Sequence, residues 1–176
     1  FLTVESENDV TYYSYFKTEQ DVEAVITTMM AMEIDMWGSV MNVDVFDIAA
    51  LPCDEYWNED QRNLALTAFS IMEGVSWGGY YSIIGHADVL IDNSFRFGVM
   101  TEERKEFWLA QANFIKALCY FNIARNWGDA PIPPNSTATE PLAKSPVKEV
   151  LGKAIECAEK ALVLPTHEKL VDSYGN

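Results

Sequence analysis

The sequence lacks any hydrophobic run of the roughly 20 residues that a membrane-spanning helix needs, although hydrophobic residues make up 49% of the chain. Its first residues, Phe1 to Ser6, have neither the basic start nor the apolar stretch of a signal peptide. We therefore expect no membrane span here, and any targeting segment was either removed or never present.

Basic residues are also scarce. The chain has 12 Lys and Arg against 27 Asp and Glu, which gives a net charge of -15. No Lys or Arg stripe is present that could neutralise a phosphate backbone. This balance excludes nucleic acid as an expected partner and disfavours anionic membrane surfaces. Neutral ligands such as uncharged sugars would hardly feel the field.

Cysteine is too sparse for a structural framework. Cys53, Cys119 and Cys157 lie far apart, without the close pairs of a zinc site or the even count of a disulfide framework. Cys119 and Cys157 fall on the apolar sides of predicted helices. We expect these thiols to behave as small, buried apolar residues.

Motifs for catalysis and cofactor binding are missing. The sequence has no Gly-rich phosphate loop, nucleophile elbow, Cys-x-x-Cys or His-Glu-x-x-His. The acids Asp44, Asp47, Asp54 and Glu55 lack the alternation of a calcium loop. His86 stands two positions from Asp88, a spacing at which helical side chains do not face each other. We predict no enzyme activity, no cofactor and no metal site.

Helical periodicity dominates what is present. Thr18, followed by Glu19, Gln20 and Asp21, is typical of a helix start, and Thr101 followed by two glutamates is another. Ser145 with Pro146 is expected to cap a last helix that Pro165 ends. Between these points the apolar spacing predicts helices over residues 18–36, 58–74, 77–91, 101–127 and 146–164.

The apolar faces of these helices predict the core. Residues expected to be buried aromatics are Trp77, Tyr81, Trp108, Phe114, Phe121 and Trp127. The last helix shows one face of Val147, Val150, Leu151, Ala154, Ile155, Ala158 and Leu162. Alanines recur every seven residues at 110, 117 and 124, which lets a neighbouring helix approach closely. Helix 101–127 is therefore expected to be central.

The fold class predicted from these patterns is all-α. We expect a single helical domain over residues 1–176, built of tetratricopeptide-like antiparallel helical pairs with long irregular loops. A 34-residue repeat is only faintly visible, and no segment shows strand-like alternation. The prolines of residues 131–146 predict an ordered loop that crosses between two helices.

One aromatic residue has no helix face to join. Trp57 lies with Tyr56 and Asn58 in the long loop 39–58, beside acidic residues. A flat ring flanked by polar groups suits a sugar, whose C–H face packs on the ring while its hydroxyls hydrogen-bond at the rim. We predict Tyr56, Trp57 and Asn58 as ligand-binding residues. A tryptophan that folds back to plug the core remains an equal alternative.

Three ordered segments carry a family resemblance. They are Trp77-x-x-Tyr80-Tyr81-x-Ile83-Ile84, then the run from Ala110 through Ala117, Tyr120-Phe121 and Ala124-Arg125 to Trp127-Gly128-Asp129-Ala130-Pro131, then Ser145-Pro146-Val147 through Val150-Leu151, Ala154-Ile155 and Ala158 to Leu164-Pro165. In this order and spacing they resemble the SusD/RagB family. The stretch from Tyr15 to Asp21 also looks like the start of such proteins.

The resemblance implies a non-catalytic protein that captures glycans or other nutrients. It also implies a surface-exposed outer-membrane lipoprotein, held by a lipid anchor that this chain does not contain, that delivers its ligand to a SusC-like TonB-dependent transporter. Family members are much longer, so we expect this chain to be an N-terminal portion. The alternative function is a helical-repeat scaffold that grips protein partners and has no ligand site of its own.

Overall fold

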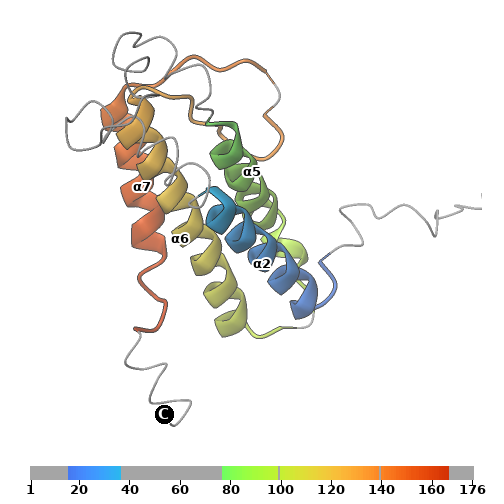
Figure 1. The fold of residues 1–176 in the computed structure, drawn as a ribbon. Helices are drawn as coiled ribbons and strands as arrows, with labels where there is room; N and C mark the ends of the chain where they lie inside the picture. The colour runs from blue at the N-terminus through green and yellow to red at the C-terminus, as the bar shows by residue number, and fades with distance from the viewer. Residues whose placement is uncertain (1–15, 37–76, 99, 139, 167–176) are drawn as a thin grey trace, which may run out of the picture.

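The computed structural model describes residues 16–36, 77–98, 100–138 and 140–166. These residues form four α-helices, α2 (Glu19–Met36), α5 (Gly78–Asp92), α6 (Glu102–Trp127) and α7 (Val147–Lys160), with a short 3-10 helix η2 (Ser94–Arg96). Successive helices run antiparallel (Figure 1). The all-α prediction is confirmed, since the described residues contain only one isolated antiparallel bridge, Ala130 with Ser145.

Two of the three predicted helix starts are confirmed by their capping contacts. At α2 the backbone N–H of Asp21 donates to Thr18 Oγ1 at 3.3 Å, and the N–H of Thr18 donates to Asp21 Oδ2 at 2.8 Å. At α6 the N–H of Arg104 donates to Thr101 Oγ1 at 3.2 Å. Each hydroxyl therefore satisfies an N–H that the helix leaves without an internal partner.

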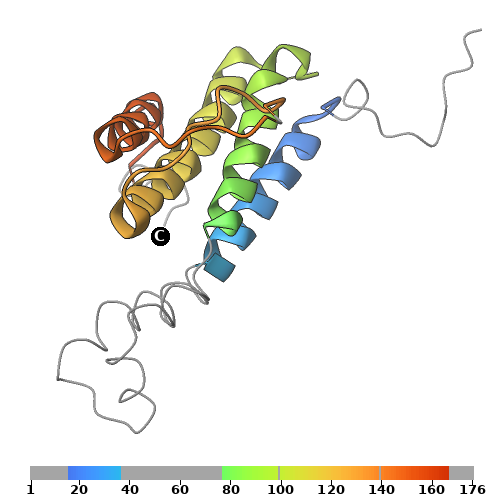
Figure 2. The same ribbon diagram turned by 90° about the horizontal axis from the view of Figure 1, so that it is seen from above.

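Helix α6 is the centre of the fold, as its sequence predicts. Helix α7 lies on one side of it and α5 with α2 on the other (Figures 1 and 2). The heptad alanines Ala110, Ala117 and Ala124 are all buried, which lets neighbouring backbones approach α6. Within the described residues the core consists mainly of Phe16, Val22, Ile26, Met29, Tyr80, Ile83, Ile84, Leu90, Trp108, Ile115, Cys119, Tyr120, Ile123 and Val150.

The predicted burial of the thiols is confirmed for the two described cysteines. Cys119 and Cys157 are both buried and free. Burial is the main cause that raises the pKa of each thiol above its ordinary value. A thiol held protonated by its surroundings is a poor nucleophile, so both act here as packing residues.

The prediction of burial is wrong for two of the six aromatic residues. Trp108 is buried and Trp77, Tyr81 and Trp127 are half-buried, whereas Phe114 and Phe121 keep 48% and 47% of their surface exposed. On α7 the predicted face is only partly covered, because Val147, Leu151, Ile155 and Leu162 are exposed while Val150 and Ala154 are buried. Periodicity identified these apolar rows correctly, but no described helix packs over them.

The start of α7 also differs from the prediction. Ser145 does not cap the helix; its backbone instead exchanges two hydrogen bonds with Ala130, at 3.1 and 2.9 Å. The first free N–H of α7, at Val147, donates to Asp129 Oδ1 at 2.8 Å. The cap thus comes from a residue 18 positions earlier, which local sequence rules do not reveal.

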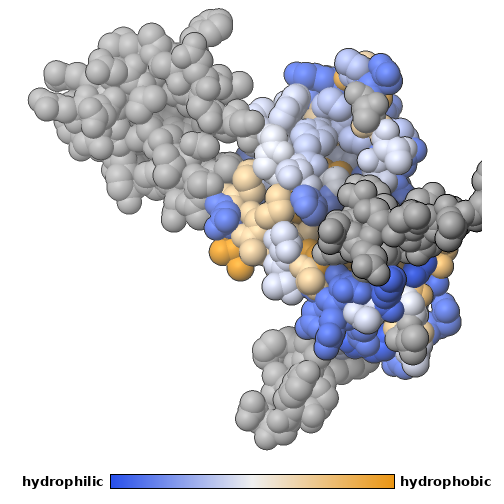
Figure 3. Space-filling view, turned by 90° about the vertical axis from the view of Figure 1, so that its right-hand side faces the viewer, coloured by the Kyte–Doolittle hydropathy of each residue, from blue (hydrophilic) through white to orange (hydrophobic). Residues whose placement is uncertain are grey.

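No helix among the described residues is long and apolar enough to cross a membrane. The face in Figure 3 nevertheless carries a hydrophobic patch amid hydrophilic surface. Exposed large hydrophobic side chains also occur on α2, at Met30 and Ile34.

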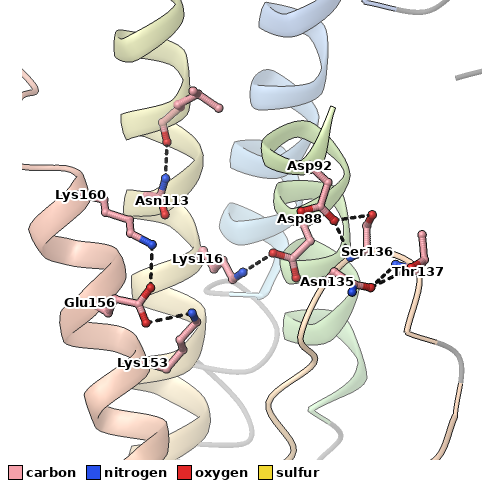
Figure 4. Close-up of polar contacts among 11 residues, drawn as sticks. Asp88, Asp92, Asn113, Lys116, Asn135, Ser136, Thr137, Lys153, Glu156 and Lys160 are labelled. Atoms are coloured by element: carbon pink, nitrogen blue, oxygen red, sulfur yellow. Dashed lines mark hydrogen bonds and ion pairs between the residues drawn. The ribbon is translucent and has the colours of Figure 1, made fainter. Parts of the chain in front are cut away.

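A buried ion pair joins α5 to α6. Lys116 Nζ donates to Asp88 Oδ1, and both side chains are more than nine-tenths buried (Figure 4). Burial raises the pKa of Asp88, and the Lys116 ammonium opposes that rise. A buried ion pair of this kind adds little stability compared with two apolar side chains in the same place. Replacing only one of the two residues, however, leaves an uncompensated charge in the interior.

We predict that Lys116→Met destabilises the protein by about 3–5 kcal/mol at neutral pH, because it leaves the Asp88 carboxylate unpaired. Without Lys116, the folded-state pKa of Asp88 lies further above its unfolded value. Lowering the pH through that folded-state pKa should therefore restore stability as the carboxylate becomes neutral. Urea unfolding over a pH series measures both effects.

Two control variants accompany this measurement. Lys105→Met removes a half-buried partner of the exposed Glu102, 3.9 Å away, and should change stability by less than about 1 kcal/mol. Asp88→Leu combined with Lys116→Met removes both charges and should recover most of the loss. A double variant as unstable as the sum of the two single variants would contradict the proposed role of the pair.

Candidate functional site

The predicted ligand-binding residues Tyr56, Trp57 and Asn58 lie outside the described residues, so their arrangement is untested. The residues on either side of this segment are described. The side chain of Met36, at the end of α2, packs directly against Gly79 in the first turn of α5. Segment 37–76 is therefore joined to the fold at two points on the same end of the helical bundle.

This end of the bundle carries a cluster of aromatic rings, which we call the aromatic end: Trp77, Tyr80, Tyr81 and Trp127. The Trp77 ring lies 5.8 Å from Tyr81 and 6.2 Å from Trp127, and Tyr80 lies 6.0 Å from Trp127, all between ring centroids. Edge-to-face and tilted arrangements of this kind are favourable for aromatic pairs. The cluster ties the start of α5 to the end of α6.

A charged side chain reaches the same cluster from the crossing loop. Lys144 Nζ lies 5.1 Å from the centroid of the Trp77 ring, within the range of a cation–π contact. Lys144 is exposed and Trp77 is half-buried. The cluster therefore keeps part of an aromatic surface at the edge of the protein, next to a positive charge.

The chain turns at Gly128 to leave this cluster. Gly128 has φ 74° and ψ -114°, and its N–H donates to the carbonyl of Ala124 at 3.0 Å. This backbone conformation is available to glycine and strained for other residues. The Asp129 cap of α7 and the Ala130–Ser145 bridge follow directly, so one short turn fixes the direction of both α7 and the crossing loop.

The crossing loop is fastened along the length of α5. Tyr81 Oη donates to the carbonyl of Pro131 at 2.7 Å near the start of α5. The last residue of α5, Asp92, accepts hydrogen bonds from the N–H and the hydroxyl of Ser136, at 2.8 and 2.7 Å (Figure 4). Between these two contacts the chain bends at Pro134 and Asn135 and turns at Ser136.

Two ionisable side chains near the cluster make structural contacts. Burial raises the pKa of Tyr81 to about 12, so its phenol remains a neutral donor to Pro131. His86 is exposed, and its Nδ1 lies 2.7 Å from the carbonyl of Ser82 one turn earlier. Within the described residues no three His, Cys, Asp or Glu side chains come together as a metal site would require.

Sequence reasoning missed two contacts that shape this structure. Lys116 occupies an apolar row of α6, and Asp88 reads as a polar break in α5, so nothing in either pattern pairs them. Lys144 lies among prolines far from Trp77 in sequence. One signal could have identified the ion pair. Each of the two helices has a charged residue at a core position, and the two charges have opposite signs.

Comparisons with known proteins agree on one family. A SusD-like family model, described as starch-binding and associating with the outer membrane, matches residues 1–172. A SusD-like protein of Formosa agariphila is 32% identical over 99 residues, which cover 56% of this chain and 17% of that protein.

A solved structure supports the fold. The crystal structure of a SusD-like protein from Bacteroides fragilis superposes with a TM-score of 0.62 at 16% identity, over 84% of this chain and 30% of that one. The similarity confirms the helical architecture. In both comparisons this chain spans less than a third of the relative's length.

Two glycine substitutions test the role of the turn at Gly128. A Cβ at Gly128 or at Gly85, inside α5, would meet no neighbouring atom within 4 Å. Gly128→Ala should nevertheless destabilise the protein by about 1–3 kcal/mol, because of the backbone conformation alone. Gly85→Ala should stabilise it by about 0.5–1 kcal/mol, because alanine is the better helix former.

Chemical denaturation of both variants provides the measurement. Opposite signs are the expected result. A Gly128→Ala variant as stable as the wild-type protein would show that the turn relaxes without cost and does not set the direction of α7.

Proposed function

Since this chain belongs to the SusD-like family, we propose that it is part of a non-catalytic, surface-exposed protein of the outer membrane that captures glycans. It passes them to a SusC-like TonB-dependent transporter and is attached to the membrane by a lipid anchor outside this sequence. The observation that carries the proposal is the match of the family model to residues 1–172, with its description as starch-binding and associating with the outer membrane.

The arrangement of the described helices is consistent with this function. Helices α2, α5, α6 and α7 form a scaffold held by a shared apolar core and by contacts such as the Asp88–Lys116 pair. Segment 37–76, which holds Tyr56, Trp57 and Asn58, is joined to this scaffold beside the aromatic end. A binding protein needs a firm support for its ligand-binding residues, and the clustered rings of Trp77 and Trp127 supply one at that point.

Charge favours neutral glycans over acidic ones. The chain carries a net charge of -15, and a field of this sign repels uronic acids and sulfated sugars while it leaves neutral sugars unaffected. Lys144, over the Trp77 ring, is a local exception. A neutral glucan such as starch is therefore the first ligand to test.

We predict that Trp57→Ala weakens binding of soluble starch about fivefold. The loss corresponds to roughly 1 kcal/mol for one ring that packs on a sugar face, by analogy with ring–ring contacts. Affinity electrophoresis of the purified protein in native gels, with soluble starch or other neutral glycans cast into them, measures the change. Trp57→Phe, which keeps a ring, should retain most of the binding.

Phe95→Ala is the matched control. Phe95 is 72% exposed in η2, which follows the other end of α5, so its loss removes an exposed ring far from the aromatic end. It should bind like the wild-type protein. Equal binding by Trp57→Ala and the wild-type protein would remove Trp57 from the site. A wild-type protein that binds no glycan yet is retained by the transporter would favour the scaffold alternative.

A further inference from the structure

The start of α2 is held by a loop that lies far along the chain. Phe16 is 3% exposed, and its ring lies 5.6 Å from the ring of Phe97, between centroids. The carbonyl of Phe16 accepts a hydrogen bond from the N–H of Gly98 at 3.0 Å. Phe97 and Gly98 belong to the loop that joins η2 to α6. The segment that leads into α2 is therefore fixed before the helix begins.

The two backbones approach each other more closely than side chains would allow. A Cβ on Gly98 would overlap the carbonyl oxygen of Lys17, and this oxygen belongs to the backbone, so it cannot rotate aside as a side chain can. The N–H of Met100 donates to the carbonyl of Gly98 at 2.8 Å, which fixes the turn in which this glycine lies. Glycine permits such a crossing because it has no side chain.

Helix α6 holds the first residue of α2. Glu19 Oε1 accepts hydrogen bonds from Trp108 Nε1 at 2.8 Å and from Arg104 Nε at 2.6 Å. These two bonds, the Trp108 bond first, lower the pKa of Glu19. The starts of α2 and α6 lie at the same end of the bundle (Figure 1). We call the residues that make these contacts the N-terminal clasp: Phe16, Glu19, Phe97, Gly98, Arg104 and Trp108.

We propose that the N-terminal clasp is a load-bearing joint, which passes a pull on residues 1–15 to α6 and the loop before it instead of to the first turn of α2. A helix that is pulled from its end unwinds from that end, because the terminal turn has the fewest hydrogen bonds and the lowest local stability. The contacts of Phe16 lie ahead of that turn, and Glu19 ties the turn itself to α6. These contacts must break before α2 can unwind.

The joint suits the proposed membrane attachment, and this step alone rests on the proposed function. A protein that is tethered through the polypeptide ahead of Phe1, and bound to a glycan that is itself fixed, is loaded between the tether and the glycan. Helix α2 runs from the clasp to Met36, where segment 37–76 with the predicted ligand-binding residues begins. A joint at Phe16 keeps this load off α2.

Force spectroscopy of the full chain at constant load tests the proposal. Two DNA handles are attached through p-azidophenylalanine, one in place of Phe121 on α6, which is 47% exposed. The other replaces either Phe1, ahead of the clasp, or the exposed Gln20, behind it. We expect the first rupture to be at least about tenfold slower when the load enters at residue 1 than at residue 20. Equal rates from the two points would overturn the proposal.

Glu19→Gln separates the joint from ordinary stability. The amide loses the ion pair with Arg104, and without load it should change the unfolding equilibrium constant by less than about threefold. Under load at residue 1 it should speed the first rupture at least about fivefold, and under load at residue 20 it should have no effect. Glu102→Gln is the matched control, because Glu102 pairs with Lys105 outside the clasp, and both rates should stay as in the wild-type protein.

Gly98→Ala should give the same pattern with a larger effect, because the added methyl separates the two backbones. If this variant does not fold, Glu19→Gln decides the question. A Glu19→Gln variant that ruptures faster by the same factor from both loading points would show a general loss of stability and would overturn the joint. A protein that shows the expected rates but binds no starch would count against the proposed function alone, since these measurements contain neither glycan nor membrane.

Discussion

The structure depends on the need to cover helix α6. This helix has apolar residues on nearly every side, so it is stable only when other helices surround it. Helices α2, α5 and α7 meet that need in the described part of the chain. The turn at Gly128 leads the chain from α6 into α7, and the crossing loop is hydrogen-bonded to α5 at Tyr81 and Asp92.

The polar residues on α6 limit how the surrounding helices can pack. Asn113 donates to the carbonyl of Leu109 in its own helix, and Asn122 accepts from Arg125. Lys116 instead needs a partner from another helix, and Asp88 of α5 supplies it. Sliding α5 by one turn would leave both charges buried and unpaired, at a cost of several kcal/mol. Apolar burial holds the helices together, and this pair selects one register between them.

Local rules predicted the elements of this fold and missed the contacts between them. Thr18 and Thr101 cap helices through residues three positions away, so their sequence neighbourhood contains the whole interaction. The Asp129 cap and the Asp88–Lys116 pair join residues far apart in the chain, and their local patterns give no sign of it. Phe114 and Phe121 were predicted to be buried because periodicity reveals an apolar row but not what covers it. The candidate residues Tyr56, Trp57 and Asn58 remain a prediction, since they lie outside the described residues.

The scaffold residues indicate the family more clearly than they indicate the ligand. The segment from Trp127 to Pro131 must satisfy several backbone constraints at once: a left-handed glycine, a cap for α7 and a carbonyl for Tyr81. Few residue types meet all of them, so the sequence there is distinctive. A sugar-binding residue faces a weaker constraint, because any ring with nearby polar groups can fill the role. The corner is therefore tied to the fold, whereas the choice of the glycan that we propose as ligand would depend on residues that the fold supports but does not dictate.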